Sequence, residues 1–400
     1  MLLDVPMGAE TWTLAIADDR LLHVPLPAGD TIADVRAAVR AAMERPRRLD
    51  FPLRRAMTPD DRIALVVDEQ VPSVGELVTG VLEYLASAGI GPDFVTIVTT
   101  PGSGQAEWID ALPDEFADVH TEVHQPGDRK QMSYLAASKL GRRIYLNRTL
   151  VDADQIIAIS GRRYDPQLGY TGAEAGLYPV LSDDETRRTL DDQLTNESPT
   201  PEPNAIRAEA AEIAWLLGSP IFVQAIEAGN GGLADILAGL IDSSADGIAA
   251  QDAHWKTRVA APVDIVLATV RGRGDTFEQI AMAAAAAARA VRSEGIIVLL
   301  TDLDPVLGEG MELLRQSDDY SRAFRVVADK RPRDRATVVQ WMAAATHARL
   351  FLASGLRPEI VEELFATPIL SPGEVQRLLD AGGTCLYLPD ADKRLVVVDE

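Results

Sequence analysis

Residues 161–191 combine the layout of a ligand-binding loop with side chains that supply few catalytic groups. An apolar strand predicted over 156–159 leads into a loop with Gly161 and the turn 169–172, and a helix is expected after it. Glycines at such a corner leave backbone N–H groups accessible to a ligand. The stretch contains acids and arginines but no His, Cys or Lys. Its layout favours ligand binding, and its composition argues against the commonest bases and metal ligands.

Alternating strands and helices are expected to position this loop. Continuous apolar runs at 62–67 and 94–99 predict strands buried on both faces, and residues 73–89 between them have the pattern of a helix. A second strand–helix–strand series lies within 263–301. Such alternation predicts an α/β fold with mainly parallel sheets, and ligands of such folds bind beyond the carboxyl ends of the strands.

The length of 400 residues favours two domains, because one hydrophobic core seldom organises so long a chain. We predict an N-terminal α/β domain over 1–255 and a C-terminal α/β domain over 256–400, with the Pro-rich segment 197–204 as the competing boundary. The first residues, about 50 of them, alternate in polarity and predict a small antiparallel addition. Two domains facing each other would form an interdomain cleft, where small molecules commonly bind.

Charge and composition exclude several classes of function. A net charge of −23 repels phosphate backbones and anionic membranes, so we expect neither nucleic acid nor a membrane as a partner. The single cysteine, Cys385, excludes an intramolecular disulfide, and the N-terminus lacks the features of a signal peptide. We therefore expect a cytoplasmic protein whose oligomeric state the sequence leaves open. A small anionic ligand would need a local basic pocket.

Four segments resemble, in order, those of the lactate racemase family. Residues 66–72 (VVDEQVP) resemble its strand-end Asp-x-Thr-Arg-Pro, and residues 97–105 (IVTTPGSGQ) resemble its Ala-Thr-Gly-x-His corner. Residues 164–175 (YDPQLGYTGAEA) resemble its His-x-x-x-Gly-Tyr-Ser-Gly-Gly-x-Lys loop, and residues 274–282 (GDTFEQIAM) resemble a segment that reaches the substrate. The resemblance implies two α/β domains with a nickel-pincer nucleotide between them, and racemisation of a 2-hydroxy acid.

The positions that carry this family's chemistry hold other residues here: Val71, Ser103, Asp165, Ala175, Asp191 and Met282. Ser103 and Asp165 occupy the places of the two catalytic histidines. Ala175 occupies the place of the Lys that anchors the cofactor covalently, and Asp191 lies near that of the nickel-binding His. Gln279 and the turn 169–172 are retained.

These replacements remove groups that the family's reaction needs. Racemisation needs two bases flanking the carbon, each with a pKa near the working pH. Ser103 cannot act as a base without a partner, and Asp165 can do so only if burial raises its pKa. Nickel prefers imidazole and sulfur ligands, and Ala175 can form no bond to a cofactor. We predict no nickel-pincer racemisation, no cofactor and no metal.

The remaining site candidates come from the strand ends and the turn. The candidate catalytic residues are Asp165, Ser103 and Gln279. The candidate ligand-binding or cofactor-binding residues are Asp68, Thr100, Gly102, Gly169, Tyr170, Thr171, Gly172 and Arg271.

Each candidate also has an ordinary structural explanation. Asp68 could cap the turn after its strand, and Asp165 precedes a proline, as in Asx-Pro turns. Gln279 has the spacing of a capping box with the threonine three residues before it. Arg162 and Arg163 are the best candidates to bind an anion, and surface charge is their structural alternative.

The sequence is compatible with three functions. The first is a divergent, racemase-like protein that binds a small anionic molecule in the interdomain cleft without the ancestral reaction. The second is a non-catalytic structural or partner protein, a pseudoenzyme of the family. The third is an active 2-hydroxy-acid racemase or epimerase, which is an isomerase.

Overall fold

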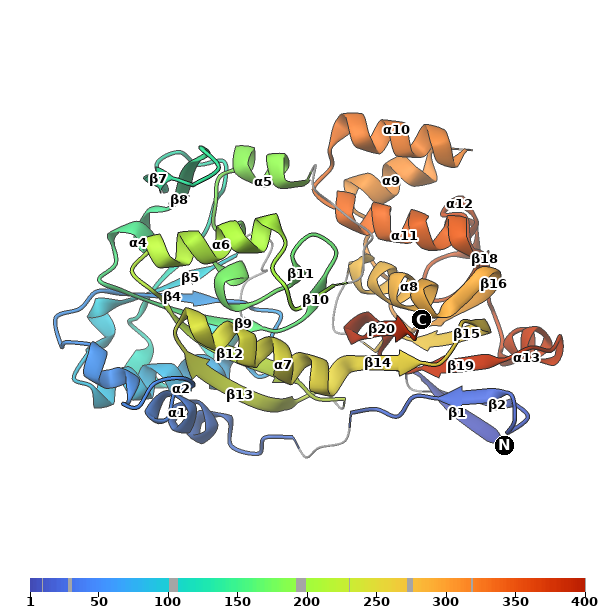
Figure 1. The fold of residues 1–400 in the computed structure, drawn as a ribbon, viewed down its shortest axis with the longest axis horizontal. Helices are drawn as coiled ribbons and strands as arrows, with labels where there is room; N and C mark the ends of the chain where they lie inside the picture. The colour runs from blue at the N-terminus through green and yellow to red at the C-terminus, as the bar shows by residue number, and fades with distance from the viewer. Residues whose placement is uncertain are drawn as a thin grey trace. The chain divides into compact units, whose positions relative to one another are not determined.

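The computed structural model describes residues 1–8, 10–27, 31–100, 107–191, 199–229, 231–271, 276–317 and 319–399. These residues fall into two compact units (Figure 1). We call them the N-unit, which lies within residues 28–254, and the C-unit, which combines residues 1–27 with residues 255–400.

A six-stranded sheet in the order β13-β12-β9-β4-β5-β6 forms the centre of the N-unit. Its strands are β4 (Ile63–Val67), β5 (Val95–Thr99), β6 (His120–Val123), β9 (Gln155–Gly161), β12 (Ile221–Glu227) and β13 (Leu233–Gly239). Neighbouring strands run parallel, except that β13 is antiparallel to β12. The central strands β4 and β12 are buried along their whole length, as expected for parallel strands covered on both faces.

Helices cover both faces of this sheet. The α-helices of the N-unit are α1 (Val35–Glu44), α2 (Val74–Ser87), α3 (Glu107–Asp110), α4 (Arg148–Asp152), α5 (Asp184–Asp191), α6 (Ala205–Leu216) and α7 (Ser244–Trp255). The short 3-10 helix η4 (Ala173–Gly176) follows the turn 169–172. Because alternate residues of a strand point to opposite faces, Leu65 of β4 packs with α1 and α2, whereas Val66 packs with α4, η4 and α6.

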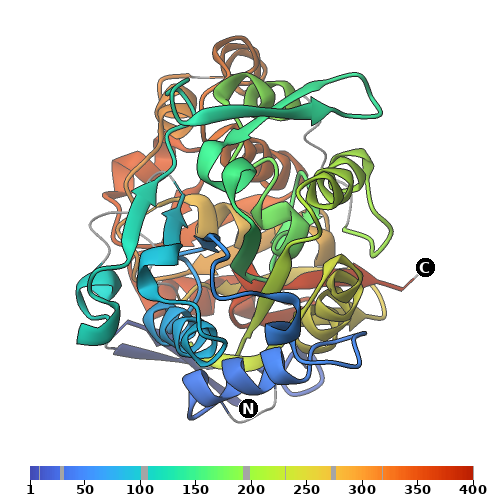
Figure 2. The ribbon, with the colours of Figure 1, turned by 90° about the vertical axis from the view of Figure 1, so that its left-hand side faces the viewer.

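Two antiparallel hairpins of the N-unit lie outside the main sheet. One joins β7 (Met132–Ala137) to β8 (Arg143–Asn147), and it projects beside the sheet in Figure 2. The other joins the two-residue strands β10 (Tyr164–Asp165) and β11 (Gly169–Tyr170) at the carboxyl end of β9. The second hairpin therefore places the predicted loop at the edge of the sheet where ligands of α/β folds bind.

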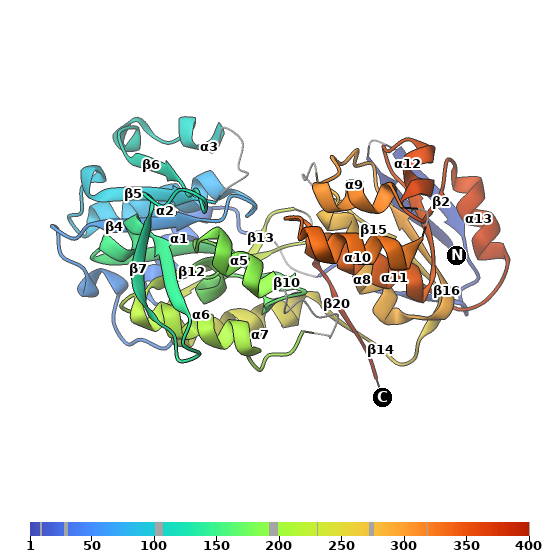
Figure 3. The same ribbon diagram turned by 90° about the horizontal axis from the view of Figure 1, so that it is seen from above.

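The C-unit contains a second six-stranded sheet, in the order β18-β17-β16-β15-β19-β3 (Figure 3). All of its neighbouring strands are parallel: β3 (Leu21–His23), β15 (Val263–Thr269), β16 (Val291–Leu300), β17 (Arg349–Ala353), β18 (Thr367–Pro368) and β19 (Cys385–Leu388). Two further pairs are the antiparallel β1 (Leu2–Met7) with β2 (Glu10–Ala15), and the parallel β14 (Lys256–Val259) with β20 (Leu395–Val398). The predicted α/β class and the small antiparallel N-terminal addition are confirmed.

The helices of the C-unit are α8 (Glu278–Ala290), α9 (Glu309–Arg315), α10 (Tyr320–Lys330), α11 (Arg335–His347), α12 (Pro358–Glu363) and α13 (Pro372–Asp380). Within the described part of the chain, no helix is long and apolar enough to cross a membrane.

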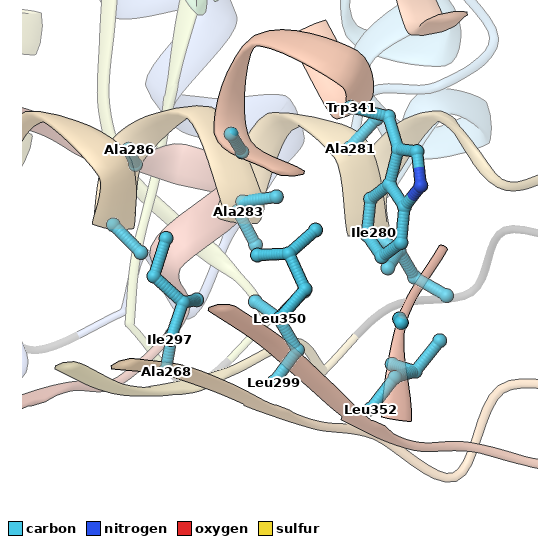
Figure 4. Close-up of a cluster of buried hydrophobic side chains, with 14 of the residues drawn as sticks. Ala268, Ile280, Ala281, Ala283, Ala286, Ile297, Leu299, Trp341, Leu350 and Leu352 are labelled. Atoms are coloured by element: carbon cyan, nitrogen blue, oxygen red, sulfur yellow. The ribbon is translucent and has the colours of Figure 1, made fainter. Parts of the chain in front are cut away.

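The alanine run of α8 forms a close contact with the sheet of the C-unit. Ala283 and Ala286 are buried and face Ile297 and Leu299 of β16 in the core shown in Figure 4. Small side chains allow a helix to approach a sheet closely without leaving voids. The run serves packing, as its helix propensity and size predict.

Candidate functional site

An ion-pair cluster of Asp68, Arg163 and Glu227 lies at the carboxyl-terminal edge of the N-unit sheet. Asp68 follows β4, Arg163 follows β9 and Glu227 ends β12, and these strands are neighbours. Arg163 donates from Nη1 to Oδ2 of Asp68 at 2.9 Å and from Nε to Oε1 of Glu227 at 3.3 Å. Its Nη2 is buried and has no hydrogen-bond partner in the described structure.

The surroundings keep Arg163 charged and fixed. Burial by itself lowers the pKa of Arg163, but the charges of Asp68 and Glu227 more than offset it and raise the pKa above its ordinary value. A Cβ atom on Gly161 would lie 2.7 Å from Nη2, so the glycine leaves the space that the guanidinium occupies.

Asp68 has both the role of a site residue and that of a turn cap. Its Oδ2 accepts hydrogen bonds from Arg163 and from the N–H of Gly161 at 3.1 Å. Its Oδ1 accepts the N–H of Gln70 at 3.1 Å, so it also caps the turn after β4. The carboxylate therefore cross-links the ends of two adjacent strands.

Arg162 points into the protein and is 1% exposed, so the prediction of surface charge is wrong for this residue. Its guanidinium donates to Oε1 of Gln224 at 2.6 and 2.8 Å, to Oγ of Ser244 at 2.7 Å and to the carbonyl oxygen of Thr171 at 2.9 Å. Burial lowers its pKa to about 10, which leaves it charged at neutral pH. All three of its nitrogens are engaged, so Arg162 ties the turn to β12 and α7.

The predicted turn residues are held firmly within the N-unit. The buried Tyr170 donates its hydroxyl to Oδ1 of Asp252 at 2.9 Å, and burial raises the pKa of this phenol. The guanidinium of Arg207 lies 5.3 Å from the centre of the Tyr170 ring, which is a cation–π distance. Oγ1 of Thr171 accepts the N–H of Arg163 at 3.1 Å.

Both glycines of the turn have positive φ, +77° at Gly169 and +82° at Gly172. A side chain at either place would strain the backbone. The sequence Gly-Tyr-Thr-Gly is therefore explained by the turn geometry, the Tyr170 hydrogen bond and the Arg163 contact.

Asp165 forms an Asx-type turn, as expected for an aspartate that precedes a proline. Its Oδ1 accepts the N–H groups of Leu168 at 2.6 Å and Gln167 at 2.8 Å. Burial raises the pKa of Asp165, although these two N–H groups act in the opposite direction. The raised pKa meets one condition for a base, while one oxygen is already occupied by the turn.

The position expected for the cofactor anchor is a buried alanine. Ala175 is 1% exposed and packs in a core cluster with Leu168 and Tyr178. Its neighbour Glu174 is 4% exposed, and the buried Oε2 of that side chain has no hydrogen-bond partner in the described structure. Asp191 ends α5, and its side chain lies outside the described residues.

Three candidates come from the corner after β5. Thr100 follows this strand and is half-buried. Gly102 and Ser103 lie outside the described residues, so their roles stay predictions.

Arg271 and Gln279 belong to the C-unit. Arg271 forms a bidentate ion pair with the buried Asp390 at 2.8 and 2.7 Å, and this hydrogen bonding raises the pKa of the arginine. The capping box proposed for Gln279 is not formed, because α8 begins at Glu278 and Thr276 pairs in a β-bridge with Val306. The Oε1 of Gln279 is buried without a partner in the described structure.

Sequence reasoning missed Glu227, Gln224 and Glu174. Gln224 and Glu227 lie inside the apolar strand β12, and polar residues in a buried strand need partners. That signal was available in the sequence. Nothing in the local pattern indicates that Glu174, on a short 3-10 helix, would be buried.

The residues present do not fit the nickel-pincer nucleotide that the resemblance implies. The covalent anchor would require a nucleophilic side chain at Ala175, whose place is a packed core. No group of three or more His, Cys, Asp or Glu side chains that could hold a metal occurs in the described ranges. We therefore derive no reaction step through this cofactor.

Comparisons with known proteins relate this chain to lactate racemase. The model of the lactate racemase N-terminal domain matches residues 7–198. The lactate racemase apoprotein from Thermoanaerobacterium thermosaccharolyticum is similar in structure, with a TM-score of 0.82 and 16% identity over 99% of this chain and 100% of that chain. A protein from Thermotoga maritima has a TM-score of 0.66 and 11% identity, over 94% of this chain and 100% of that one. No curated protein matches the sequence. Residues 7–198 thus match the lactate racemase N-terminal domain, and the chain has the fold of the lactate racemase apoprotein along its length.

Proposed function

We propose that this lactate-racemase-like protein binds a small hydroxylated organic anion at the edge formed by Asp68, Arg163 and Glu227. We further propose that it does not racemise this ligand by nickel-pincer chemistry. The observation that supports binding is the buried Nη2 of Arg163, a charged donor without a partner in the described structure. Such groups are rare in folded proteins and gather at functional sites.

The charges of the cluster indicate the class of ligand. Arg163 lies between two carboxylates, so the cluster is negative overall when Asp68 and Glu227 are ionised. A bare anion gains little there, because like charges repel. A hydroxyl group donates to a carboxylate oxygen, and a ligand carboxylate accepts from a guanidinium. A molecule with both groups matches the acceptors and the donor together.

Among the described residues, this edge does not offer the groups for the ancestral reaction. Oδ1 of Asp165 holds the turn through two backbone N–H groups, and Arg162 is committed to internal hydrogen bonds. Ala175 lies in a packed cluster. These observations support binding without pincer chemistry.

The test is isothermal titration calorimetry with L-lactate, D-lactate and propionate at low ionic strength. We expect both lactates to bind at least about tenfold more tightly than propionate, because propionate has no hydroxyl group to donate to Asp68 or Glu227. Arg163→Gln should abolish lactate binding. Arg163→Lys keeps a positive charge between Asp68 and Glu227 but loses the planar guanidinium group with its several N–H donors. This variant should fold normally and bind lactate more weakly than the wild type.

The matched control is Arg188→Gln, which removes an arginine of the same unit that is 65% exposed. It should leave lactate binding unchanged. Equal affinity for lactate and propionate, or equal lactate affinity in the wild type and Arg163→Gln, would contradict the proposal.

A further inference from the structure

One segment of this acidic protein contains positive charges and no negative ones. The whole chain has a net charge of −23, yet residues 129–148 contain no Asp or Glu. The Lys and Arg residues of this segment are Arg129, Lys130, Lys139, Arg142, Arg143 and Arg148. We call residues 129–148 the basic hairpin, because they include β7, β8 and the connection between them.

Among the described residues, most of these cations have no carboxylate as an ion-pair partner. Arg142 pairs with the buried Glu209 at 3.3 Å. The other five side chains are exposed, and none of them forms an ion pair within the described ranges. Two nearby carboxylates, Asp128 and Glu212, accept hydrogen bonds from backbone N–H groups of the hairpin. Ion pairs among the described residues therefore leave most of the charge of the hairpin unpaired.

The hairpin also exposes apolar and aromatic side chains of the kind that anchor interfaces. Tyr134 on β7 is 51% exposed, and Leu140 in the connection is 67% exposed. The Tyr134 ring lies 5.6 Å from that of Tyr145 on β8. Tyrosine and arginine are enriched at protein–protein interfaces, whereas isolated surface charge carries no such anchors.

An acidic segment of the same unit has the complementary charge. Residues 107–118 contain no Lys or Arg, and their acids are Glu107, Asp110, Asp114, Glu115 and Asp118. All five are exposed, and none of them forms an ion pair in the part of the chain that the structure describes. Glu115 does lie within electrostatic range of Arg36. We call residues 107–118 the acidic segment.

The two surfaces lie on different sides of the N-unit. The acidic segment runs through α3 before β6, and the basic hairpin follows β6. Figures 2 and 3 both show the hairpin and α3 apart from each other. Neither surface covers the other within one chain, so both are available to a second molecule.

We propose that the basic hairpin is a docking surface for the acidic segment of a second copy of this chain. The chain itself provides the complementary charge, which argues for a second copy over an unrelated polyanion. In a two-fold dimer, the commonest closed assembly, the contact would occur twice. Charge complementarity of this kind speeds encounter and fixes the register, while the tyrosine and leucine contribute packing.

The experiment is sedimentation velocity of the full chain and of two charge-reversal variants. The hairpin variant is Lys139→Glu with Arg143→Glu, and the acidic-segment variant is Glu115→Lys with Asp118→Lys. We expect the wild type to dimerise at about 0.01 M ionic strength, where charges act over about 30 Å, and to dissociate at about 1 M, where they act over about 3 Å. Each variant alone should self-associate at least about tenfold more weakly.

A mixture of the two variants tests whether association returns when the charges of both surfaces are reversed. In the mixture, the reversed, acidic hairpin of one variant faces the reversed, basic segment of the other. The native hairpin of the second variant faces the native acidic segment of the first, so both contacts are again between opposite charges and a heterodimer should form. The control variant Lys330→Glu with Arg333→Glu makes the same change of charge in the C-unit and should dimerise like the wild type. Circular dichroism checks that every variant is folded.

Three results would overturn the proposal. One is a monomeric wild type at low ionic strength. Another is unchanged dimerisation of both variants. The third is a mixture of the two variants that fails to associate. If the wild type is monomeric and binds heparin, the hairpin binds polyanions instead of a second copy of the chain.

Discussion

A Cβ atom on Gly172 would lie 2.7 Å from the carbonyl oxygen of Gly161. The turn therefore rests directly on the end of β9, and only glycine permits that contact at a φ of +82°. The Gly-Tyr-Thr-Gly sequence that resembles a cofactor loop is required by packing in this chain. Its presence therefore does not by itself show that a cofactor binds.

Gly172→Ala should lower the free energy of unfolding by about 2–4 kcal/mol, because backbone strain adds to a steric clash with Gly161. The control is Gly141→Ala, where φ is +77° but no atom lies within 4 Å of the added Cβ. Gly141→Ala should cost only the strain, about 1 kcal/mol. Urea denaturation followed by circular dichroism measures both. Equal losses would show that the contact with Gly161 is not tight.

The sequence predicted the elements of this fold better than their partners. Residues 62–67 were recognisable as a buried strand because their apolar run is continuous, and the structure has β4 at Ile63–Val67. The parallel pairing of β3 with β19 joins segments far apart in the chain, and no local pattern encodes it. Arg162 was misread for the same reason, since its partners Gln224 and Ser244 come from later elements.

Asp68 and Arg163, two residues that the sequence singled out, lie together in the structure, and Glu227 beside them was not predicted. Asp68 and Arg163 could be placed because both follow buried strands. Glu227 completes their cluster, but its approach depends on the order of the strands in the sheet. The burial of Glu174 depends on the packing of η4 and could not be read from neighbouring residues.

Arg162→Ala should destabilise the N-unit by about 3–5 kcal/mol. The substitution leaves Gln224, Ser244 and the carbonyl oxygen of Thr171 buried without their donor. Thermal unfolding of the variant, compared with Arg188→Ala on the surface of the same unit, gives the difference. A loss below about 1 kcal/mol would mean that water replaces the guanidinium easily.

Asp165→Asn tests the raised pKa of this carboxyl group. A carboxyl whose pKa is higher in the folded state costs stability above its folded pKa, and the cost disappears as the pH falls to the unfolded value of about 3.9. Asparagine keeps an oxygen for the N–H groups of Leu168 and Gln167 but has no charge. The variant should therefore equal or exceed the wild type in stability at pH 7, and lose this advantage near pH 4.

Chemical denaturation at a series of pH values gives the comparison for Asp165→Asn. A variant that is less stable than the wild type at pH 7, with the same difference at pH 4, would mean that the charged carboxylate itself stabilises the turn.

The protein has the fold of lactate racemase, and we propose that it does not hold that enzyme's cofactor. The most direct measurement is the intact mass and nickel content of the full chain after co-expression with the enzymes that make the nickel-pincer nucleotide. The lactate racemase from Thermoanaerobacterium thermosaccharolyticum, treated in the same way, is the positive control. We predict the unmodified mass and no stoichiometric nickel, because Ala175 offers no group for a covalent bond. A mass increase by the cofactor together with stoichiometric nickel would contradict the account.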